Sequence, residues 1–387
     1  MFISYNKYMK PNYQQHALEL HKKLKGKITS QSKLEVKTEA DLSLVYTPGV
    51  SAVSQLLAEK PELAPDYTIK HNTVAVISDG SAVLGLGNIG PLGALPVMEG
   101  KAMLFSQLAG LNSFPIVLDT QDTDEIVQTI INIAPVFSAI NLEDIQAPKC
   151  FEIEKRLQEA LSIAVVHDDQ HATAIVVLAG LINALEVVGK AANTSKVVIL
   201  GAGAAGVGVA SLLVEYGFED IVVVDSKGII SSSRNDLNKE KQVIAGLTNK
   251  HDQQGELKDA LENSDIFIGL SSGGKLPPEL IKTMNSKSII FALANPEPEI
   301  LPDLALEAGA MVVASGRSDF ANQINNVLVF PGLFKGLIDN KIVEVSSKVK
   351  IEAAVALAGV VDQPTADIII PSVFDPAVVG AIAKSIV

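Results

Sequence analysis

The chain has 387 residues and a formal net charge of −13, which argues against nucleic acid or an anionic membrane as its main partner. With 48% hydrophobic and 19% charged residues it can bury a large interior, and its length favours two domains over a single core. The single cysteine, Cys150, excludes an internal disulfide and a thiolate metal cage, which fits a reducing cytoplasm.

The N-terminal segment is polar, and we expect helix and loops over residues 1–40. Its first residues, MFISYNKYMKPNYQQH, lack the continuous apolar core of a signal peptide, so we expect a cytoplasmic protein. Tyr46 then precedes a Thr-Pro-Gly turn. A tyrosine there either packs with its hydroxyl in water or stands at a cleft mouth, where its proton is available. The residues alone favour packing.

A β-branched run over 72–80 predicts a strand, and a glycine-rich loop follows it. Three of its glycines match the G-x-G-x-x-G spacing of dinucleotide-binding loops: Gly85, Gly87 and Gly90. The context is wrong for that use, because no strand runs directly into the motif and Pro91 and Gly93 are expected to delay the helix. We interpret these glycines as letting the backbone approach another part of the protein closely.

Lys101 follows, near the expected start of the apolar helix KAMLFSQLAG. The positive end of the helix dipole, together with partial burial, would lower the pKa of its amine, and this would suit a general base. The alternative is an ordinary helix lysine that is exposed to solvent.

Two acidic pairs, Glu143-Asp144 and Asp168-Asp169, each end an apolar run that predicts a buried strand. Strands that alternate with helices predict a parallel sheet, whose strand ends gather at one edge. Grouped carboxylates need a compensating cation, and hard oxygen ligands suit Mg²⁺ or Mn²⁺. Glu143 and Asp144 can reach one ion only if the chain turns there, and Pro148 favours a turn. Alternatively, Asp168 or Asp169 only caps the next helix.

The longest apolar segment, 172–189, approaches the length of a membrane span, but Asn183 and Glu186 interrupt it. We expect a buried central helix and no membrane partner. His167 and His171 lie four residues apart at its start, but without a third nitrogen or sulfur ligand nearby they do not predict a zinc site.

A second glycine motif has the full context of a Rossmann fold: a strand from Lys196, the loop, a helix, and a second strand that ends at Asp225. The residues expected to hold a pyrophosphate at the helix N-terminus are Gly201, Gly203, Ala204, Ala205 and Gly206. Asp225 lies at the right distance to accept ribose hydroxyls, which favours NAD over NADP. Lys227 could nevertheless hold a 2′-phosphate.

Three later apolar runs extend the same sheet and place Ser271 and Asn295 at its carboxyl edge, facing the cofactor crevice. Asn295 could be only a turn residue, and the pair Asn325-Asn326 could cap a helix or bind a carboxylate. The patterns together predict an α/β protein with three parts. We expect an N-terminal α/β domain with a parallel sheet over 1–160, a doubly wound Rossmann-type NAD(P)-binding domain over 161–340, and a helical tail over 341–387 that packs back on the body.

Seven segments, in order, resemble the motifs of malic enzymes of the short bacterial type: SLVYTPGV, VLGLGNIGPLGALPVMEGKAMLF, NLEDIQAPKCFEIE, HDDQHATA, GAGAAG, ANP and NNVLVFPG. The resemblance implies Tyr46 as general acid, Lys101 as general base, and Asp168 as an acidic neighbour that tunes the lysine. It further implies Glu143, Asp144 and Asp169 as ligands of Mg²⁺ or Mn²⁺, and Asn295 and Asn326 as amides that hold the substrate carboxylate.

The activity implied by the resemblance is oxidative decarboxylation of malate to pyruvate and CO₂, with reduction of NAD or NADP, in a homodimer. One rival is an oxaloacetate decarboxylase without net hydride transfer, and another is a nucleotide sensor that has lost catalysis. Ala82 stands where larger members carry an arginine, so a contact to the substrate carboxylate must come from elsewhere, either the asparagines or a neighbouring subunit.

Overall fold

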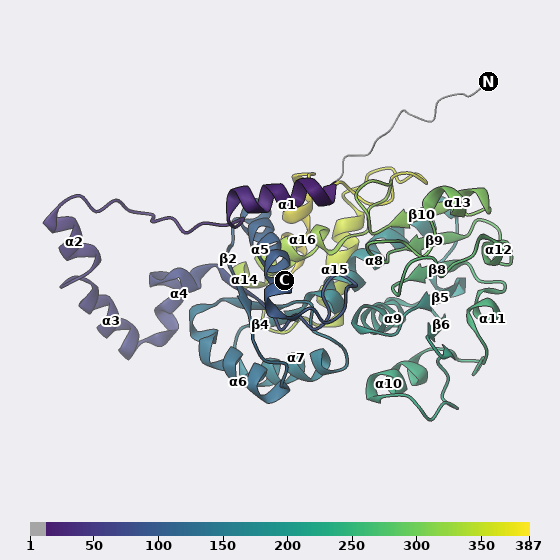
Figure 1. The fold of residues 1–387 in the computed structure, drawn as a ribbon, viewed down its shortest axis with the longest axis horizontal. Coiled ribbons are helices and arrows are strands. Elements are labelled where there is room, and N and C mark those ends of the chain that lie inside the picture. The colour runs from purple at the N-terminus through teal and green to yellow at the C-terminus, as the bar shows by residue number, and fades with distance from the viewer. Residues whose placement is uncertain (1–12) are drawn as a thin grey trace, which may run out of the picture.

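A computed structural model describes residues 13–387. Residues 1–12, which carry most of the segment used to argue against a signal peptide, lie outside the described residues. Two α/β units lie side by side, and the last helices of the chain return to the first unit (Figure 1). The expected fold class is confirmed.

The first sheet is entirely parallel, with strand order β2-β1-β3-β4. Three of its four strands are buried runs rich in β-branched or aliphatic residues, as expected for a sheet covered on both faces. The strands are β1 (Thr73–Ser78), β2 (Asn112–Val117), β3 (Ala139–Leu142) and β4 (Ala164–His167).

The second sheet has the order β10-β9-β8-β5-β6-β7, and only the short β7 runs antiparallel. Its glycine loop follows β5, and β6 ends at Asp225 as expected. The strands are β5 (Lys196–Leu200), β6 (Asp220–Asp225), β7 (Gly228–Ile229), β8 (Ile266–Gly269), β9 (Ile289–Ala292) and β10 (Val312–Ser315).

Helices cover both faces of each sheet. In the first sheet, Val74 and Val76 pack in one core with residues of α5 and α14, whereas Ala75 and Ile77 pack with α6 and α7 on the other face. The helices of the body are α5 (Gly90–Ala109), α6 (Thr123–Ile133), α7 (Lys149–Ala160), α8 (Asp168–Val188), α9 (Ala204–Tyr216), α10 (Lys239–Leu247), α11 (Leu257–Leu261), α12 (Pro278–Ile281), α13 (Pro302–Glu307), α14 (Phe330–Asp339), α15 (Ser347–Ala358) and α16 (Ala377–Ser385).

The helix α8 joins the two units. It is long and apolar enough to cross a membrane by length and composition, but 78% of that window is buried inside the protein, as in a core helix. Its flanks pack against α9 and α15. The buried amide of Asn183 donates hydrogen bonds to the carbonyls of Ala358 and Ile369, each at 3.0 Å, which ties the C-terminal segment to this helix.

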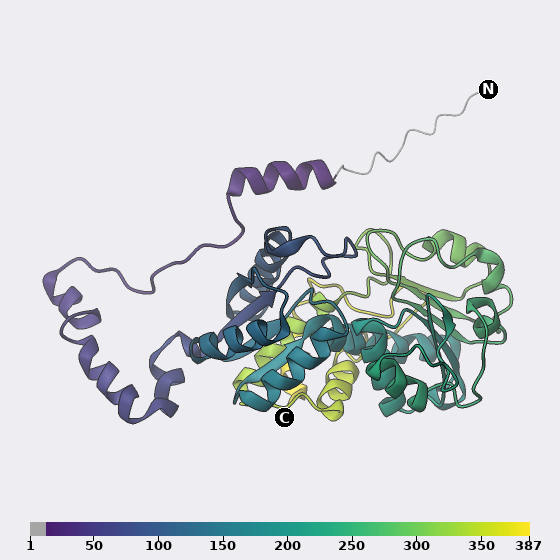
Figure 2. The same cartoon turned by 60° about the horizontal axis from the view of Figure 1, so that its bottom comes forward.

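An N-terminal arm projects away from the body (Figure 2). It carries α1 (Tyr13–Leu24), α2 (Glu39–Val45), α3 (Val50–Glu59) and α4 (Ala64–Tyr67), and none of these helices buries a side chain within the described chain. A capping box formed by Thr38 and Asp41 begins α2, so local hydrogen bonds fix this helix without a core.

One local expectation was wrong. The helix α5 begins at Gly90, with Pro91 in its first turn and Gly93 inside it, so these residues do not delay the helix. The physical reason is that the first turn of a helix has no intrahelical partner for its amide N–H groups, so a proline there loses no hydrogen bond.

Candidate active site

The acidic pairs meet because their strands are neighbours. In the parallel pairing of β3 with β4, Leu142 lies opposite His167, so the next residues, Glu143 and Asp168, leave the sheet at the same edge. One carboxylate oxygen from each of Glu143, Asp144 and Asp169 lies within 4.8 Å of the others. The register of the sheet therefore brings together carboxylates that are far apart along the chain.

The chain turns at Asp144, whose φ is +53°. Aspartate tolerates this left-handed conformation. The turn lets the carboxylates of two successive residues, Glu143 and Asp144, point to the same side, as expected. The amide N–H of Asp144 donates to the Asp169 carboxylate at 3.0 Å, which holds the two strand ends together. One buried oxygen of Asp144, Oδ2, has no hydrogen-bond partner among the described residues.

Lys101 reaches this cluster from α5. Its amine donates to Glu143 Oε2 and to Asp168 Oδ2, each at 2.5 Å, and lies 4.5 Å from the centre of the Phe330 ring. The lysine is buried, with 6% of its surface exposed. It stands in the middle of α5 and not near its start, so the expected help from the helix dipole is absent.

The direction expected for the lysine pKa was also wrong. Burial alone would lower the pKa of Lys101, but the carboxylates of Asp168 and Glu143 outweigh burial and raise it. Burial and the neighbouring Asp169 raise the pKa of Asp144 to about 7. The cluster by itself is therefore short of positive charge, and its oxygens are the donors that a divalent cation such as Mg²⁺ or Mn²⁺ takes.

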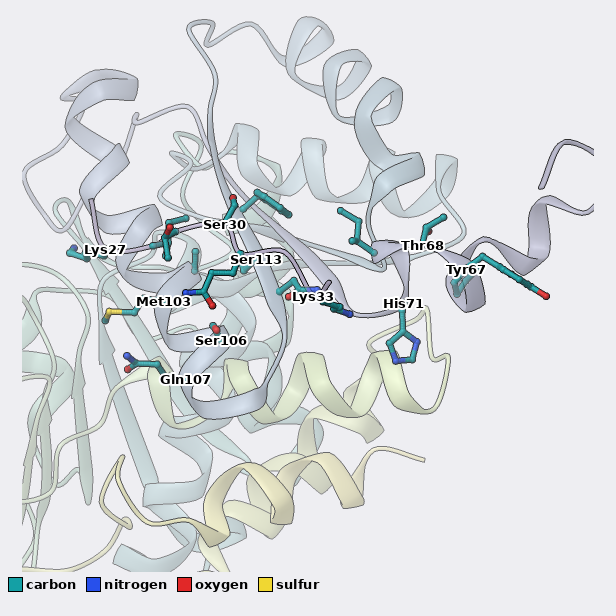
Figure 3. Close-up of a pocket in the computed structure, with 18 of the residues that line it drawn as sticks. Lys27, Ser30, Lys33, Tyr67, Thr68, His71, Met103, Ser106, Gln107 and Ser113 are labelled. Carbon is teal, nitrogen blue, oxygen red and sulfur yellow. The ribbon is translucent and has the colours of Figure 1, made fainter. Parts of the chain in front are cut away.

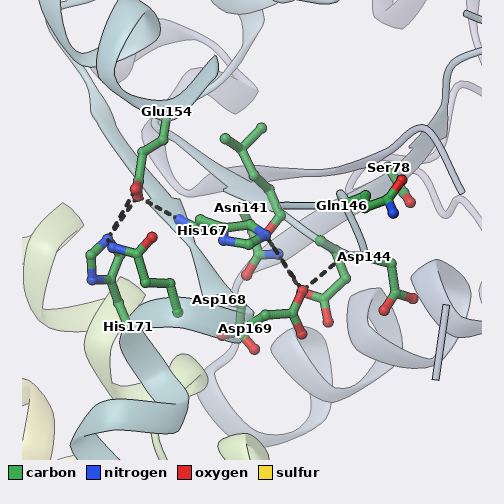
Figure 4. Close-up of polar contacts among 12 residues, drawn as sticks. Ser78, Asn141, Asp144, Gln146, Glu154, His167, Asp168, Asp169 and His171 are labelled. Atoms are coloured by element: carbon green, nitrogen blue, oxygen red, sulfur yellow. Dashed lines mark hydrogen bonds and ion pairs between the residues drawn. The ribbon is translucent and has the colours of Figure 1, made fainter. Parts of the chain in front are cut away.

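Asp169 contacts a buried network formed by His167, Glu154 and His171 (Figure 4). His167 Nε2 lies 3.4 Å from the Asp169 carboxylate, and Glu154 accepts the His167 amide N–H at 2.7 Å. Glu154 also lies 3.0 Å from the ring of His171. Burial would raise the pKa of Glu154, but its contacts with His171 and His167 lower it to about 2. The sequence offered only the spacing of the two histidines as a signal for this network.

The two asparagines expected to bind substrate differ in position. Asn326 donates to Asp168, so it belongs to the lysine cluster. Asn295 is exposed after β9 and makes no hydrogen bond with that cluster among residues 13–387. Its amide group lies by Gly316, and its carbonyl faces the loop that carries Gly85.

The second glycine motif lines a cavity of about 820 Å³. Of the residues expected to bind the nucleotide, Gly201, Gly203, Asp225 and Ser271 line this cavity. Ala204 and Ala205 form the first turn of α9, and Asn295 lies outside the lining.

Two of the three glycines of this loop, Gly201 and Gly206, are required by close packing. Gly201 has a φ of +119°, and a Cβ on Gly206 would lie 1.9 Å from the carbonyl oxygen of Gly201. A Cβ on Gly203 would meet nothing within 4 Å, which leaves open space where a pyrophosphate would lie. The residues present therefore fit a dinucleotide.

The first glycine motif approaches the second unit closely at one of its three glycines, Gly85, whereas a Cβ on Gly87 or Gly90 would meet nothing within 4 Å. Gly85 has a φ of +73°, and a Cβ there would lie 2.6 Å from the carbonyl oxygen of Asn295. Gly87, two residues on, has a φ of +81° with nothing near its Cβ position. The loop after the first strand thus touches the turn after β9.

Within one subunit, Tyr46 lies away from the acidic cluster. It is the C-cap residue of α2, and 65% of its surface is exposed. The helix α2 lies on the projecting arm (Figures 1 and 2). A larger cavity of about 1170 Å³ lies where the segment from Lys27 to Lys33 passes over α5 and β2 (Figure 3). Its lining holds none of the acidic cluster, so it is a separate hollow near the base of the arm.

The fold and the site define a nucleotide-dependent α/β protein in which a lysine and a carboxylate cluster lie beside a Rossmann domain. The model of the malic enzyme N-terminal domain matches residues 23–158, and that of the malic enzyme NAD-binding domain matches residues 170–383. The chain belongs to the malic enzyme family.

Three relatives illustrate this membership. The bifunctional malic/malolactic enzyme of Bacillus subtilis (strain 168) is 51% identical over 375 residues, covering 96% of this chain and 92% of its own. The NADP-dependent malic enzyme of Halomonas elongata is 46% identical, covering 90% and 83%. The crystal structure of an NAD-dependent malic enzyme from Thermotoga maritima superposes with a TM-score of 0.92 at 48% identity, covering 96% and 98%.

The contact between Gly85 and Asn295 can be tested with a matched pair of variants. Gly85→Ala and Gly87→Ala both place an alanine at positive φ, which costs about 1–2 kcal/mol. Only Gly85→Ala also drives a Cβ against the Asn295 carbonyl, an overpacking that adds roughly 1–3 kcal/mol. We expect a clearly lower melting temperature for Gly85→Ala than for Gly87→Ala. Equal melting temperatures would contradict the contact.

Proposed function

We propose that this protein catalyses the oxidative decarboxylation of malate to pyruvate and CO₂, with reduction of a nicotinamide nucleotide. The observation that carries the proposal is the convergence of Glu143, Asp144 and Asp169 beside the buried Lys101. Malate offers a hydroxyl proton, a hydride and a carboxylate that must leave. These three requirements correspond to a general base for the proton, a nucleotide pocket for the hydride and a cation site for the loss of the carboxylate.

The metal site is proposed at Glu143, Asp144 and Asp169. The unpartnered oxygen of Asp144 and the burial of Glu143 and Asp144 support it, because buried carboxylates are unfavourable without a compensating charge. When bound, a divalent cation supplies a Lewis acid for charge that develops on the substrate ketone, and the nucleotide supplies the hydride acceptor. With Glu143 engaged by the cation, Lys101 would lose one of its two anionic partners, and its pKa would fall.

Two different residues of the chain carry out the two proton transfers. Lys101 takes the proton of the C2 hydroxyl, held in place by Asp168, which Asn326 also contacts. After C2 is oxidised, the C3–C4 bond breaks, CO₂ leaves, and the electron pair forms an enolate. A general acid must then protonate C3 to give pyruvate, and Tyr46 is proposed for this role. Asn295 and Asn326 are proposed to hold the substrate carboxylate.

We propose a homodimer in which Tyr46 serves the site of the partner subunit. The arm that carries Tyr46 exposes a run of large apolar side chains and buries none of them, which indicates an interaction surface. They are Leu42, Leu44, Val45, Tyr46 and Val50. A second copy related by a twofold axis would receive this arm and return its own.

The cofactor choice and the location of the protein complete the proposal. NAD is proposed as the preferred nucleotide, because Asp225 ends β6 where the ribose hydroxyls of a dinucleotide are held. A cytoplasmic location is proposed because the single Cys150 is buried and unpaired.

An assay with purified protein, malate, Mn²⁺ and NAD⁺ tests the activity. We expect NADH and pyruvate in equal amounts, and a loss of roughly 10²–10⁴-fold in kcat for Lys101→Ala with nucleotide affinity retained. Lys155→Ala, whose side chain is 72% exposed, is the control and should keep full activity. Pyruvate from oxaloacetate without NADH from malate would favour the decarboxylase instead. Lactate without NADH would indicate a malolactic reaction.

The shared site is tested by mixing inactive subunits. Tyr46→Phe and Lys101→Ala should each be nearly inactive, but a mixed dimer contains one site with both residues intact if Tyr46 acts in the partner. Random pairing should restore about a quarter of the wild-type activity. A Tyr46→Phe/Lys101→Ala double variant mixed with either single variant should restore nothing. Failure of the two single variants to complement would contradict the shared site.

A further inference from the structure

The carboxylates of Glu143 and Asp169 each have one oxygen that the protein already holds. Glu143 Oε2 accepts from the amide of Asn141 at 2.9 Å and from Lys101 at 2.5 Å. Asp169 Oδ2 accepts from the Asp144 amide N–H at 3.0 Å and lies 3.4 Å from His167 Nε2. Among residues 13–387, neither Glu143 Oε1 nor Asp169 Oδ1 makes a hydrogen bond. The second oxygen of each carboxylate is therefore the atom left for a cation.

Asn141 is placed to hold Glu143. It lies two residues earlier on β3, and the amide N–H of Glu143 still donates to the β1 carbonyl of Ile77 at 2.9 Å, so both side chains point to the same side of the sheet. The Asn141 side chain is fully buried, and its nitrogen also lies 3.3 Å from the carbonyl oxygen of Leu142. Both neighbours are acceptors, which fixes the NH₂ group towards them. If a bound cation frees Lys101 from Glu143, as proposed above, Asn141 is the donor that stays.

His167 has the same relation to Asp169 (Figure 4). It is the last residue of β4, two residues before Asp169, and its ring is fully buried. Its backbone N–H donates to Glu154 at 2.7 Å, which fixes the position of the ring. The Asp169 side chain is 34% exposed, so packing alone does not fix its carboxylate. Its orientation therefore depends on the two groups that face Oδ2, the ring of His167 and the amide N–H of Asp144.

We propose that Asn141 and His167 are positioning residues for the divalent cation: each holds one oxygen of an acidic residue and so presents the other oxygen to the ion. The inference rests on the proposed metal site and deepens it. A carboxylate that is already held by one oxygen loses less rotational freedom when the ion binds, so the affinity for the ion is higher. Neither residue touches the ion or the substrate, and both act through the carboxylates of Glu143 and Asp169.

Binding of Mn²⁺ to the full chain without malate or nucleotide, followed by the electron paramagnetic resonance of the free ion, tests this inference without relying on turnover. His167→Leu and Asn141→Leu each remove a donor and keep an apolar side chain of similar size. We expect each to raise the Kd for Mn²⁺ by about 10–100-fold. His167→Gln should return the Kd to within about threefold of the wild-type value, because its amide nitrogen can replace Nε2 as the donor. A residue needed only for stability would not show this rescue.

Two other buried polar residues provide matched controls. His171→Leu removes a buried ring that contacts Glu154, and Asn183→Leu removes a buried amide that donates to backbone carbonyls far from the cluster. Both should lower the melting temperature and leave the Kd for Mn²⁺ unchanged. An equal loss of affinity in these controls, or unchanged affinity in His167→Leu and Asn141→Leu, would overturn the inference alone. Absence of Mn²⁺ binding by the wild-type protein would overturn the metal site as well.

Discussion

The crowding of buried negative charge at the edge of the first sheet governs the rest of the site. Among the described residues, Glu143, Asp144, Asp168 and Asp169 meet one buried lysine, Lys101, and His167 lies 3.4 Å from Asp169. Charges removed from water are stable only when they are paired, so this set cannot persist on lysine alone without raising carboxylate pKa values. Burial and the neighbouring Asp169 raise the pKa of Asp144 for this reason, and a divalent cation is the partner that would correct the imbalance.

The fold couples this cluster to the nucleotide pocket through two helices. α8 begins with the acidic residues Asp168 and Asp169, and α9 begins at the phosphate loop. A Cβ on Gly208 of α9 would lie 2.4 Å from the carbonyl oxygen of Gln170, so the two helices touch backbone to backbone at the first turn of α8. The close approach of Gly85 to Asn295 is a second backbone contact between the same two units. The acidic cluster and the nucleotide loop are thus held at fixed positions relative to each other.

Much of this arrangement could be predicted from the sequence, because it follows from local patterns and from the geometry of parallel sheets. The strands, the glycine loop before α9 and the meeting of the acidic pairs belong to this class. The expected delay of the helix at Pro91 and the expected lowering of the Lys101 pKa were wrong, since helix boundaries are weakly encoded and a pKa depends on groups distant in sequence. Nothing near Tyr46 indicated that its arm leaves the body. The ion pair between Asp225 and Arg234 could not be predicted either, because the conformation of the loop between them brings the two side chains together.

The most direct test of the central claim is a titration of the wild-type protein with Mn²⁺, followed by calorimetry or by the electron paramagnetic resonance of the free ion. The account predicts one site per chain, with affinity lost in Asp169→Asn and kept in Asp362→Asn, a substitution outside the cluster. Absence of stoichiometric binding by the wild-type protein, or equal binding by Asp169→Asn, would contradict it.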